Sequence, residues 1–197
     1  MEPEEGHLAI HFDRDEPGVL ASMVDQLAEL LDQQDTPVEQ IGPPAVAEDP
    51  FAQWEAEFSQ GAGPTIDDPD APELDMADPV VRRLFPDAYP DDPAASHDFR
   101  RFTQARQRGQ KVADAQRVVA DLQATGRNGV CLVPRDHVGA WLKTLTNVRL
   151  ALAARLDITD EVSADQVAQL PQDDPRSWMH DLYQWTGWVQ ECLIEAL

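Results

Sequence analysis

The two cysteines are the residues with the clearest capacity for redox chemistry. Cys131 lies in the apolar run VCLV, and Cys192 lies on the apolar side of the last predicted helix. They are far apart in the sequence, so neither a CxxC motif nor a zinc-binding spacing is present. Buried cysteines commonly act as small, inert hydrophobic groups. The alternative is that the fold brings both sulfur atoms within disulfide reach, which makes Cys131 and Cys192 candidate redox residues.

The histidines do not form a metal-binding or catalytic pattern. His7 and His11 lie four residues apart with no third ligand beside them in the sequence, so we predict no metal site. His97, His137 and His180 each lie near a predicted helix start, where a polar residue in the first turn is the simpler interpretation.

Motifs of known enzymes are also missing from the sequence. HExxH, GxSxG, the phosphate-binding P-loop and GxGxxG do not occur. The three Asp-Asp pairs lie beside proline, as is typical of turns and helix caps. We therefore predict no catalytic residues and no cofactor, and we expect a protein that is not an enzyme. The pairs are Asp67 with Asp68, Asp91 with Asp92, and Asp173 with Asp174.

The formal net charge of −22 belongs mainly to the first part of the chain. Residues 1–79 hold 21 acidic residues and one basic residue, whereas residues 80–197 hold 16 acidic and 14 basic residues. Such a field repels nucleic acid and anionic lipid and attracts basic protein surfaces. We therefore expect a protein partner, no membrane binding and no autonomous DNA binding. With no apolar run long enough for a membrane span and no signal-peptide pattern, we also expect a cytoplasmic protein.

An acidic, proline-rich stretch over residues 34–78 is predicted to be a disordered linker, since it contains 12 acidic residues, seven prolines and no basic residue. Inside it Phe51, Trp54 and Phe58 share one side of a helix that could form. These aromatic side chains are candidate partner-binding residues in a segment that folds on binding. The alternative is that they pack against the chain's own domain.

A basic stretch provides the second set of candidate partner-binding residues: Arg100, Arg101, Arg106, Arg108 and Lys111. These side chains could bind an anionic partner or the acidic linker of the same chain, or they could form a solvated helix face.

The periodicity of apolar residues predicts a mainly α-helical bundle with a small two-stranded β ribbon. The ribbon pairs residues 7–12 with residues 130–133. Helices are expected after Pro17, over 93–125, from Pro134 to about 157, from 163 to before Pro171, and from 175 almost to the end. Residues 1–33 and 79–197 are expected to form one domain, with residues 34–78 between them.

Several local signals refine these helices. Asp92 and Asp174, each followed by proline, predict helix caps, and Ser163 has the spacing of a capping box. Residues 78–93 are predicted to be extended and rich in turns. Gly109 is expected to break or kink the long helix. The apolar residues of the first and long helices are all expected in the core, including Val19, Phe99 and Phe102.

Three segments together resemble a family of actinobacterial proteins called domain of unknown function two-zero-one-seven. Members are typically encoded beside a Clp protease adaptor and a cluster for sulfur transfer and cysteine synthesis. They are described as oxidation-sensing regulators that act with an alternative sigma factor. The matching segments are RRLFPDAYPDDPAASHDFRRFT, GVCLVPRDHVGAWLKTLTNVRLALAARLDI and WVQECLIEAL.

This resemblance implies a non-enzymatic, oxidative-stress-linked transcriptional regulator that acts through contacts with an alternative sigma factor or RNA polymerase. An adaptor or accessory factor for Clp proteolysis or for sulfur and cysteine assimilation is the alternative. The sequence departs from a simple redox sensor because no closely spaced cysteine pair is present. A thiol switch would have to join Cys131 and Cys192 across the fold, or form between molecules.

Overall fold

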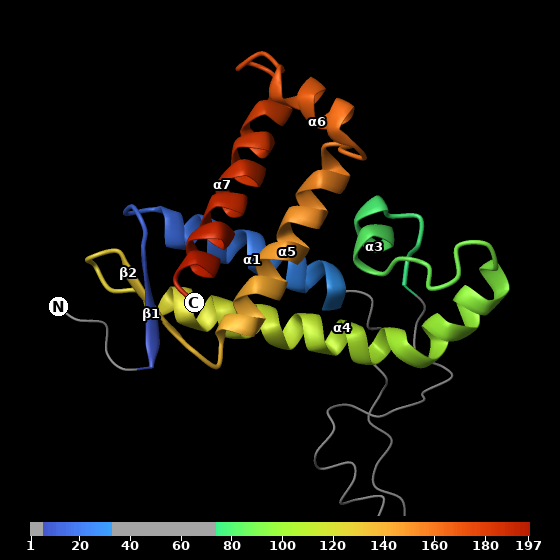
Figure 1. Ribbon diagram of the computed structural model, residues 1–197, viewed down its shortest axis with the longest axis horizontal. Helices are drawn as coiled ribbons and strands as arrows, with labels where there is room; N and C mark the ends of the chain where they lie inside the picture. Colours follow the sequence, from blue (N-terminus) through green and yellow to red (C-terminus); the bar gives the residue numbers. More distant parts are fainter. Residues whose placement is uncertain (1–5, 33–73) are drawn as a thin grey trace, which may run out of the picture.

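The computed structural model describes residues 6–32 and 74–197, and these residues form a mainly helical structure with one small sheet (Figure 1). The predicted fold class is confirmed. Within the described residues the elements are, in chain order, β1 (His7–His11), α1 (Glu16–Asp32), α3 (Pro79–Leu84), α4 (Pro93–Gln123), β2 (Val130–Pro134), α5 (Val138–Arg155), α6 (Glu161–Ala168) and α7 (Pro175–Glu195).

The sheet pairs β1 with β2, as predicted, and the pairing is antiparallel, with Leu8 opposite Val133 and Ile10 opposite Cys131. These four side chains are buried, because alternate residues of a strand point to the same face. Gly129 precedes β2 with φ +72°, and a Cβ there would lie 2.3 Å from the Phe12 carbonyl oxygen. This glycine therefore allows the close approach of the two strands at that end of the ribbon.

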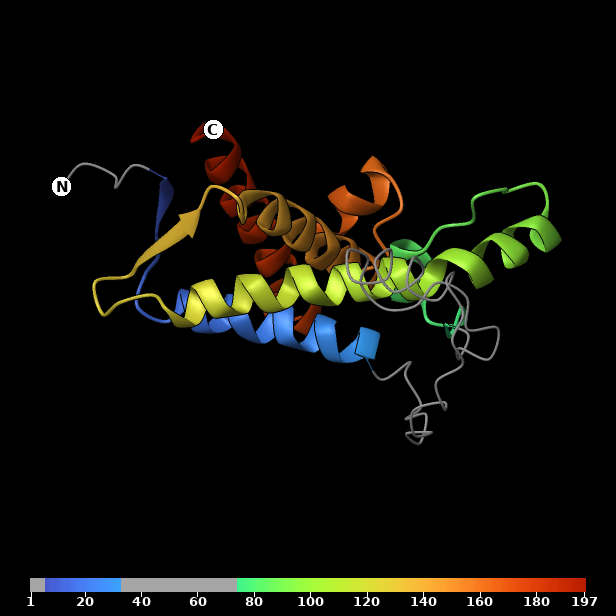
Figure 2. The ribbon, with the colours of Figure 1, turned by 90° about the horizontal axis from the view of Figure 1, so that it is seen from below.

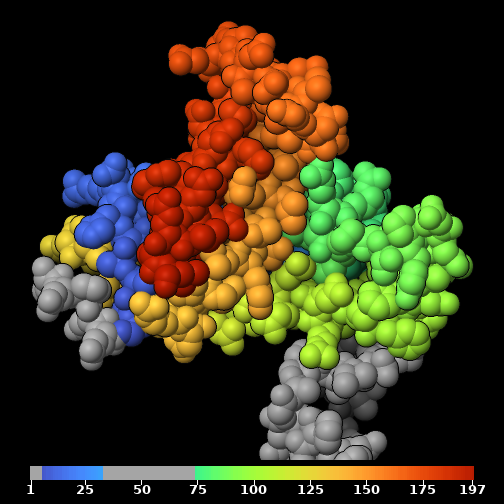
Figure 3. Space-filling model, in the orientation of Figure 1, coloured from blue at the N-terminus to red at the C-terminus, as the bar shows by residue number. Residues whose placement is uncertain are grey.

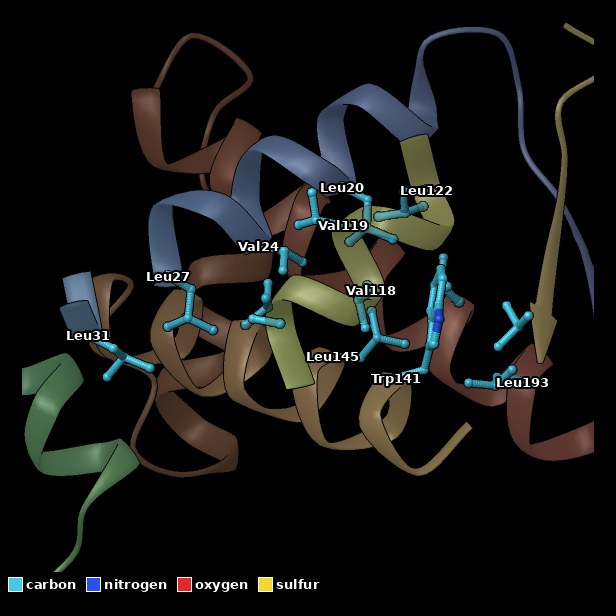
Figure 4. Close-up of a cluster of buried hydrophobic side chains, with 14 of the residues drawn as sticks. Leu20, Val24, Leu27, Leu31, Val118, Val119, Leu122, Trp141, Leu145 and Leu193 are labelled. Carbon is cyan, nitrogen blue, oxygen red and sulfur yellow. The ribbon is translucent and has the colours of Figure 1, made fainter. Parts of the chain in front are cut away.

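The main core lies where α1 and α4 run side by side in opposite directions, with α5 packed against both (Figure 2). The predicted apolar stripes of α1 and α5 and the second half of α4 supply it. Figure 4 shows the side chains that meet there: Leu20, Val24, Leu27 and Leu31 of α1, Val118, Val119 and Leu122 of α4, Trp141 and Leu145 of α5, and Leu193 of α7.

Helix α5 is central to the fold, since it contacts α1, α3, α4 and α7. Helix α7 returns alongside α5, and the two are joined through α6. In the space-filling view α6 and the adjoining ends of α5 and α7 stand out from the body (Figure 3). This projecting end has its own small core of Ala153, Leu156, Ile158 and Val167.

Three helices begin with the same Asp-Pro signal. The carboxylates of Asp78, Asp92 and Asp174 accept hydrogen bonds from main-chain N–H groups at 2.7, 3.0 and 2.8 Å, at the starts of α3, α4 and α7. The predicted caps at Asp92 and Asp174 are confirmed. The prediction of an extended path over residues 78–93 is wrong at α3, because Asp78 and the following proline begin a helix there too.

Two local predictions about helix ends and breaks are wrong. Helix α6 begins at Glu161, two residues earlier than expected, because Asp160 is its N-cap and exchanges capping-box hydrogen bonds with Ser163. Helix α4 continues through Gly109 without interruption, since a single glycine costs only about 1 kcal/mol in a helix.

The first turns of α4 are more exposed than predicted. Phe99 is 40% exposed and Phe102 is 68% exposed, whereas Gln104 and Arg108 on the same helix are buried. These turns extend beyond the end of α1 (Figure 2), so α1 does not cover their apolar side chains. Phe99 instead makes an edge-to-face contact with Tyr89 at 6.2 Å.

Candidate functional site

The two cysteines have different surroundings. Cys131 is fully buried in β2, and its thiol donates a weak hydrogen bond to the Asp121 main-chain oxygen at 3.5 Å. Burial raises the pKa of the Cys131 thiol, a hydrogen bond with Thr125 opposes this, and the nearby Asp121 charge adds to it. Cys131 is therefore a poor nucleophile at neutral pH. Cys192 on α7 is half-buried and, like Cys131, is a free thiol. Their pairing by a disulfide stays a prediction.

A cluster around the Asp121 carboxylate was missed by sequence reasoning. The carboxylate lies 3.0 Å from His137 Nδ1 and accepts a hydrogen bond from Trp141 Nε1 at 2.8 Å. His137 occupies the N-cap position of α5 but makes no side-chain cap hydrogen bond. The sequence contains one signal of this cluster: His137 and Trp141 have i, i+4 spacing, which places both on one side of a helix. The cluster ties the end of α4 to the start of α5.

A groove of about 920 Å³ lies between α4 and α5. Four basic side chains and one carboxylate line it, so it carries a local positive charge on a strongly acidic molecule. We call it the basic groove. Its charged lining residues are Arg101, Arg106, Lys111, Lys143 and Asp114, and Phe102 and Leu142 are among the others.

Buried polar side chains organise the inner part of the basic groove. The buried Asp114 carboxylate accepts hydrogen bonds from Gln110 Nε2 at 2.9 Å and Arg117 Nη1 at 3.1 Å, and it lies 3.8 Å from Lys143 Nζ. Lys111 Nζ donates to Asn147 Oδ1 at 3.0 Å. Burial lowers the pKa of Lys111, and the Asp114 charge opposes that effect. These contacts hold the lysines beside the groove.

The structure brings three of the five basic candidates to this groove. Arg101 and Arg106 are exposed on its lining, and Lys111 is half-buried beside them. Arg100 instead pairs with Asp87. Arg108 is buried, so its prediction as a surface residue is wrong.

The other candidate partner-binding residues, Phe51, Trp54 and Phe58, lie outside the described residues. Most of the predicted acidic linker does so as well. Within the described end of that stretch, Leu74 is buried and Asp78 caps α3.

A second groove, of about 740 Å³, lies between α1, α5 and α7. Trp178 is 65% exposed and Val19 is 41% exposed at this groove, so the prediction that Val19 belongs to the core is wrong. Helical periodicity showed an apolar side of α1 but not which part another helix covers. We call this surface the apolar groove; its lining includes Val19, Met23 and Leu30 of α1, Leu152 of α5, and Trp178 and Leu182 of α7.

Other kinds of site find no support in the part of the chain that the structure describes. No cluster of three or more histidine, cysteine or acidic side chains is arranged to hold a metal ion there. Among the described helices, none is long and apolar enough to cross a membrane.

Comparison with known proteins identifies a family and named relatives. The family model of a domain of unknown function, DUF2017, matches residues 1–197. The proteins called "Oxidative stress regulator AosR" in Mycobacterium tuberculosis and Mycobacterium bovis are each 31% identical over 131 residues. The match covers 61% of this chain and 58% of each relative's own length. No solved structure matches.

Proposed function

The chain belongs to the DUF2017 family, and we propose that it is a non-enzymatic regulatory protein linked to oxidative stress. The observation that carries this proposal is the similarity over 131 residues to relatives named as oxidative stress regulators. We propose further that the protein acts on transcription through contacts with another protein, either an alternative sigma factor or RNA polymerase.

The basic groove supports a role in protein binding. Arg101 and Arg106 present exposed guanidinium groups beside the exposed aromatic ring of Phe102. Arginine forms paired hydrogen bonds with carboxylates, and arginine and aromatic residues are enriched at protein interfaces. This groove would therefore bind an acidic surface of the partner.

The described polar clusters support a non-enzymatic role. The Asp121 carboxylate is occupied by His137 and Trp141, and the Asp114 carboxylate by Gln110 and Arg117. The Asp121 carboxylate joins α4 to α5, whereas the Asp114 carboxylate bonds side chains of its own helix and lies 3.8 Å from Lys143 Nζ of α5. The thiol of Cys131, which donates to the Asp121 main-chain oxygen, is buried and has a raised pKa, so it is a poor nucleophile at neutral pH.

The proposal is tested by capturing partners of the full chain from a native lysate and identifying them by mass spectrometry. We expect an alternative sigma factor or RNA polymerase subunits. The double variant Arg101→Glu, Arg106→Glu should lose them. The control Arg127→Glu, Arg135→Glu makes the same change in charge at exposed positions outside the basic groove and should retain them.

Other outcomes would contradict this proposal. Capture of Clp components or sulfur-transfer proteins in place of transcription proteins would favour the adaptor alternative. A tightly bound small molecule, with no protein partner captured, would count against both roles.

A further inference from the structure

The apolar groove extends beyond the depression of about 740 Å³ described above. A second depression of about 260 Å³ adjoins it, and both share Val19, Trp178 and Leu182. The two depressions therefore form one continuous surface along α1 and α7. A contiguous exposed apolar surface of this kind is typical of a binding site.

The apolar groove lies between three helices. Its sides come from α1 and α7, and Val148 and Leu152 of α5 lie between them. In Figure 1, α1 crosses the α5–α7 pair, and most of the residues that line the groove belong to these three helices. Met23 and Met179 also line it, and their flexible thioether side chains adapt to the shape of an apolar partner. Amphipathic helices are commonly bound in grooves between helices.

The charges around the apolar groove indicate which helix would fit. Asp15, Glu16 and Asp181 contribute carboxylates to its lining. Arg155, the basic residue among the described lining, donates to Asp78 at 2.9 Å and is thereby partly neutralised. The groove is thus apolar at its centre and acidic at its edges. An occupant with basic side chains beside an apolar stripe would complement both features.

We propose that the apolar groove binds a basic amphipathic α-helix of a partner protein. Apolar side chains at i, i+3 or i+4, and i+7 would pack on Trp178 and Val19, and lysine or arginine side chains would lie near Asp15 and Asp181. This inference rests on the proposed function, because it specifies the segment that a protein partner would contribute.

The proposal is tested with a fluorescein-labelled peptide of about 18 residues, or roughly five helical turns, in which leucines form one stripe and lysines fill the other positions. Its fluorescence anisotropy with the full-length protein should show saturable binding. A matched peptide with glutamate in place of lysine should not bind.

Two tryptophans on α7 provide a matched pair of variants. Trp178 lines the apolar groove, whereas Trp188, 52% exposed, is not part of its lining. Trp178→Ala should weaken binding of the lysine peptide about tenfold or more, as expected for a central aromatic anchor. Trp188→Ala should bind as the unchanged protein does. Asp181→Asn should weaken binding and reduce its dependence on salt. Circular dichroism checks that each variant is folded.

The inference is overturned if Trp178→Ala and Trp188→Ala bind the lysine peptide equally, or if the peptide does not bind. It is also overturned if Trp178 mediates only a dimer of this chain, seen as a change in mass by light scattering. Failure here, with a sigma factor still captured from lysate, removes the groove assignment and leaves the proposed function intact. If the peptide binds but no transcription protein is captured, the groove assignment stands and the proposed function is contradicted.

Discussion

Asp121 connects three parts of the fold through its side chain and main chain. Its carboxylate bonds Trp141 and His137 at the start of α5, and its main-chain oxygen accepts from Cys131 of β2. Trp141 is fully buried, so its indole N–H has no access to water if this acceptor is lost. A buried donor without a partner costs about 1–3 kcal/mol.

We therefore predict that Asp121→Ala lowers the free energy of unfolding by about 2–4 kcal/mol. The substitution leaves the buried indole N–H of Trp141 without an acceptor and also removes the hydrogen bond to His137. His137→Ala should cost about 1 kcal/mol, because its ring is partly exposed and Trp141 keeps its acceptor. Urea denaturation followed by circular dichroism measures both changes. Equal losses in the two variants would contradict the assigned role of the Trp141 hydrogen bond.

The two cysteines should differ in their reaction with an alkylating agent. The raised pKa and complete burial of Cys131 leave little accessible thiolate at neutral pH, whereas Cys192 is half-buried. Brief treatment with iodoacetamide, followed by peptide mass spectrometry, should therefore label Cys192 first. In urea the two rates should become similar. Faster labelling of Cys131 in the folded protein would be inconsistent with its position in β2.

At the scale of the elements, the sequence predicted the ribbon and the long helices because their signals are local. Alternation of apolar residues identifies β1 and β2, and Asp-Pro caps mark the starts of α4 and α7. Helix α3 carries the same Asp-Pro signal at Asp78 but is only six residues long, so its pattern was too short to read.

The two grooves could not be predicted in the same way. Periodicity shows which side of a helix is apolar, but not whether another helix covers it. Val19 and Phe102 follow the apolar periodicity of α1 and α4 and yet are exposed. The grooves depend on how α1, α4, α5 and α7 are placed in space, which sequence spacing does not specify. Among the basic residues that line the basic groove, Arg101, Arg106 and Lys111 were candidates from the sequence, whereas Lys143, which lies on another helix, was not.

The start of α6 provides a prediction about pH. Hydrogen bonds from Ser163 lower the pKa of the Asp160 carboxyl below its ordinary value. A carboxyl group with a lowered folded-state pKa stabilises the fold above its unfolded-state pKa, and this contribution is lost as pH falls through the folded-state pKa. Asp160→Ala should therefore reduce stability at neutral pH, and the difference from the unchanged protein should shrink in acid.

Thermal unfolding at a series of pH values measures this effect. Asp165→Ala, at an exposed position within α6, is the control and should behave like the unchanged protein. The difference in thermal stability between Asp160→Ala and the unchanged protein could instead stay constant down to strongly acidic pH. That result would argue against an ionised cap.

At the scale of the whole molecule, the described residues present two surfaces of different chemistry. The basic groove between α4 and α5 suits acidic groups, and the apolar groove between α1, α5 and α7 has acidic edges. The net charge of −22, which belongs mainly to residues 1–79, disfavours contact with nucleic acid. The absence of autonomous DNA binding stays a prediction. Together these features favour action through a protein partner.

The central claim is that this protein regulates by binding a protein of the transcription machinery. The most direct measurement is titration calorimetry of the purified full-length chain with purified alternative sigma factors and RNA polymerase core from the organism that encodes it. We predict saturable binding to at least one of them, weakened in the Arg101→Glu, Arg106→Glu variant and unchanged in Arg127→Glu, Arg135→Glu. Absence of binding to all of these proteins would contradict the claim.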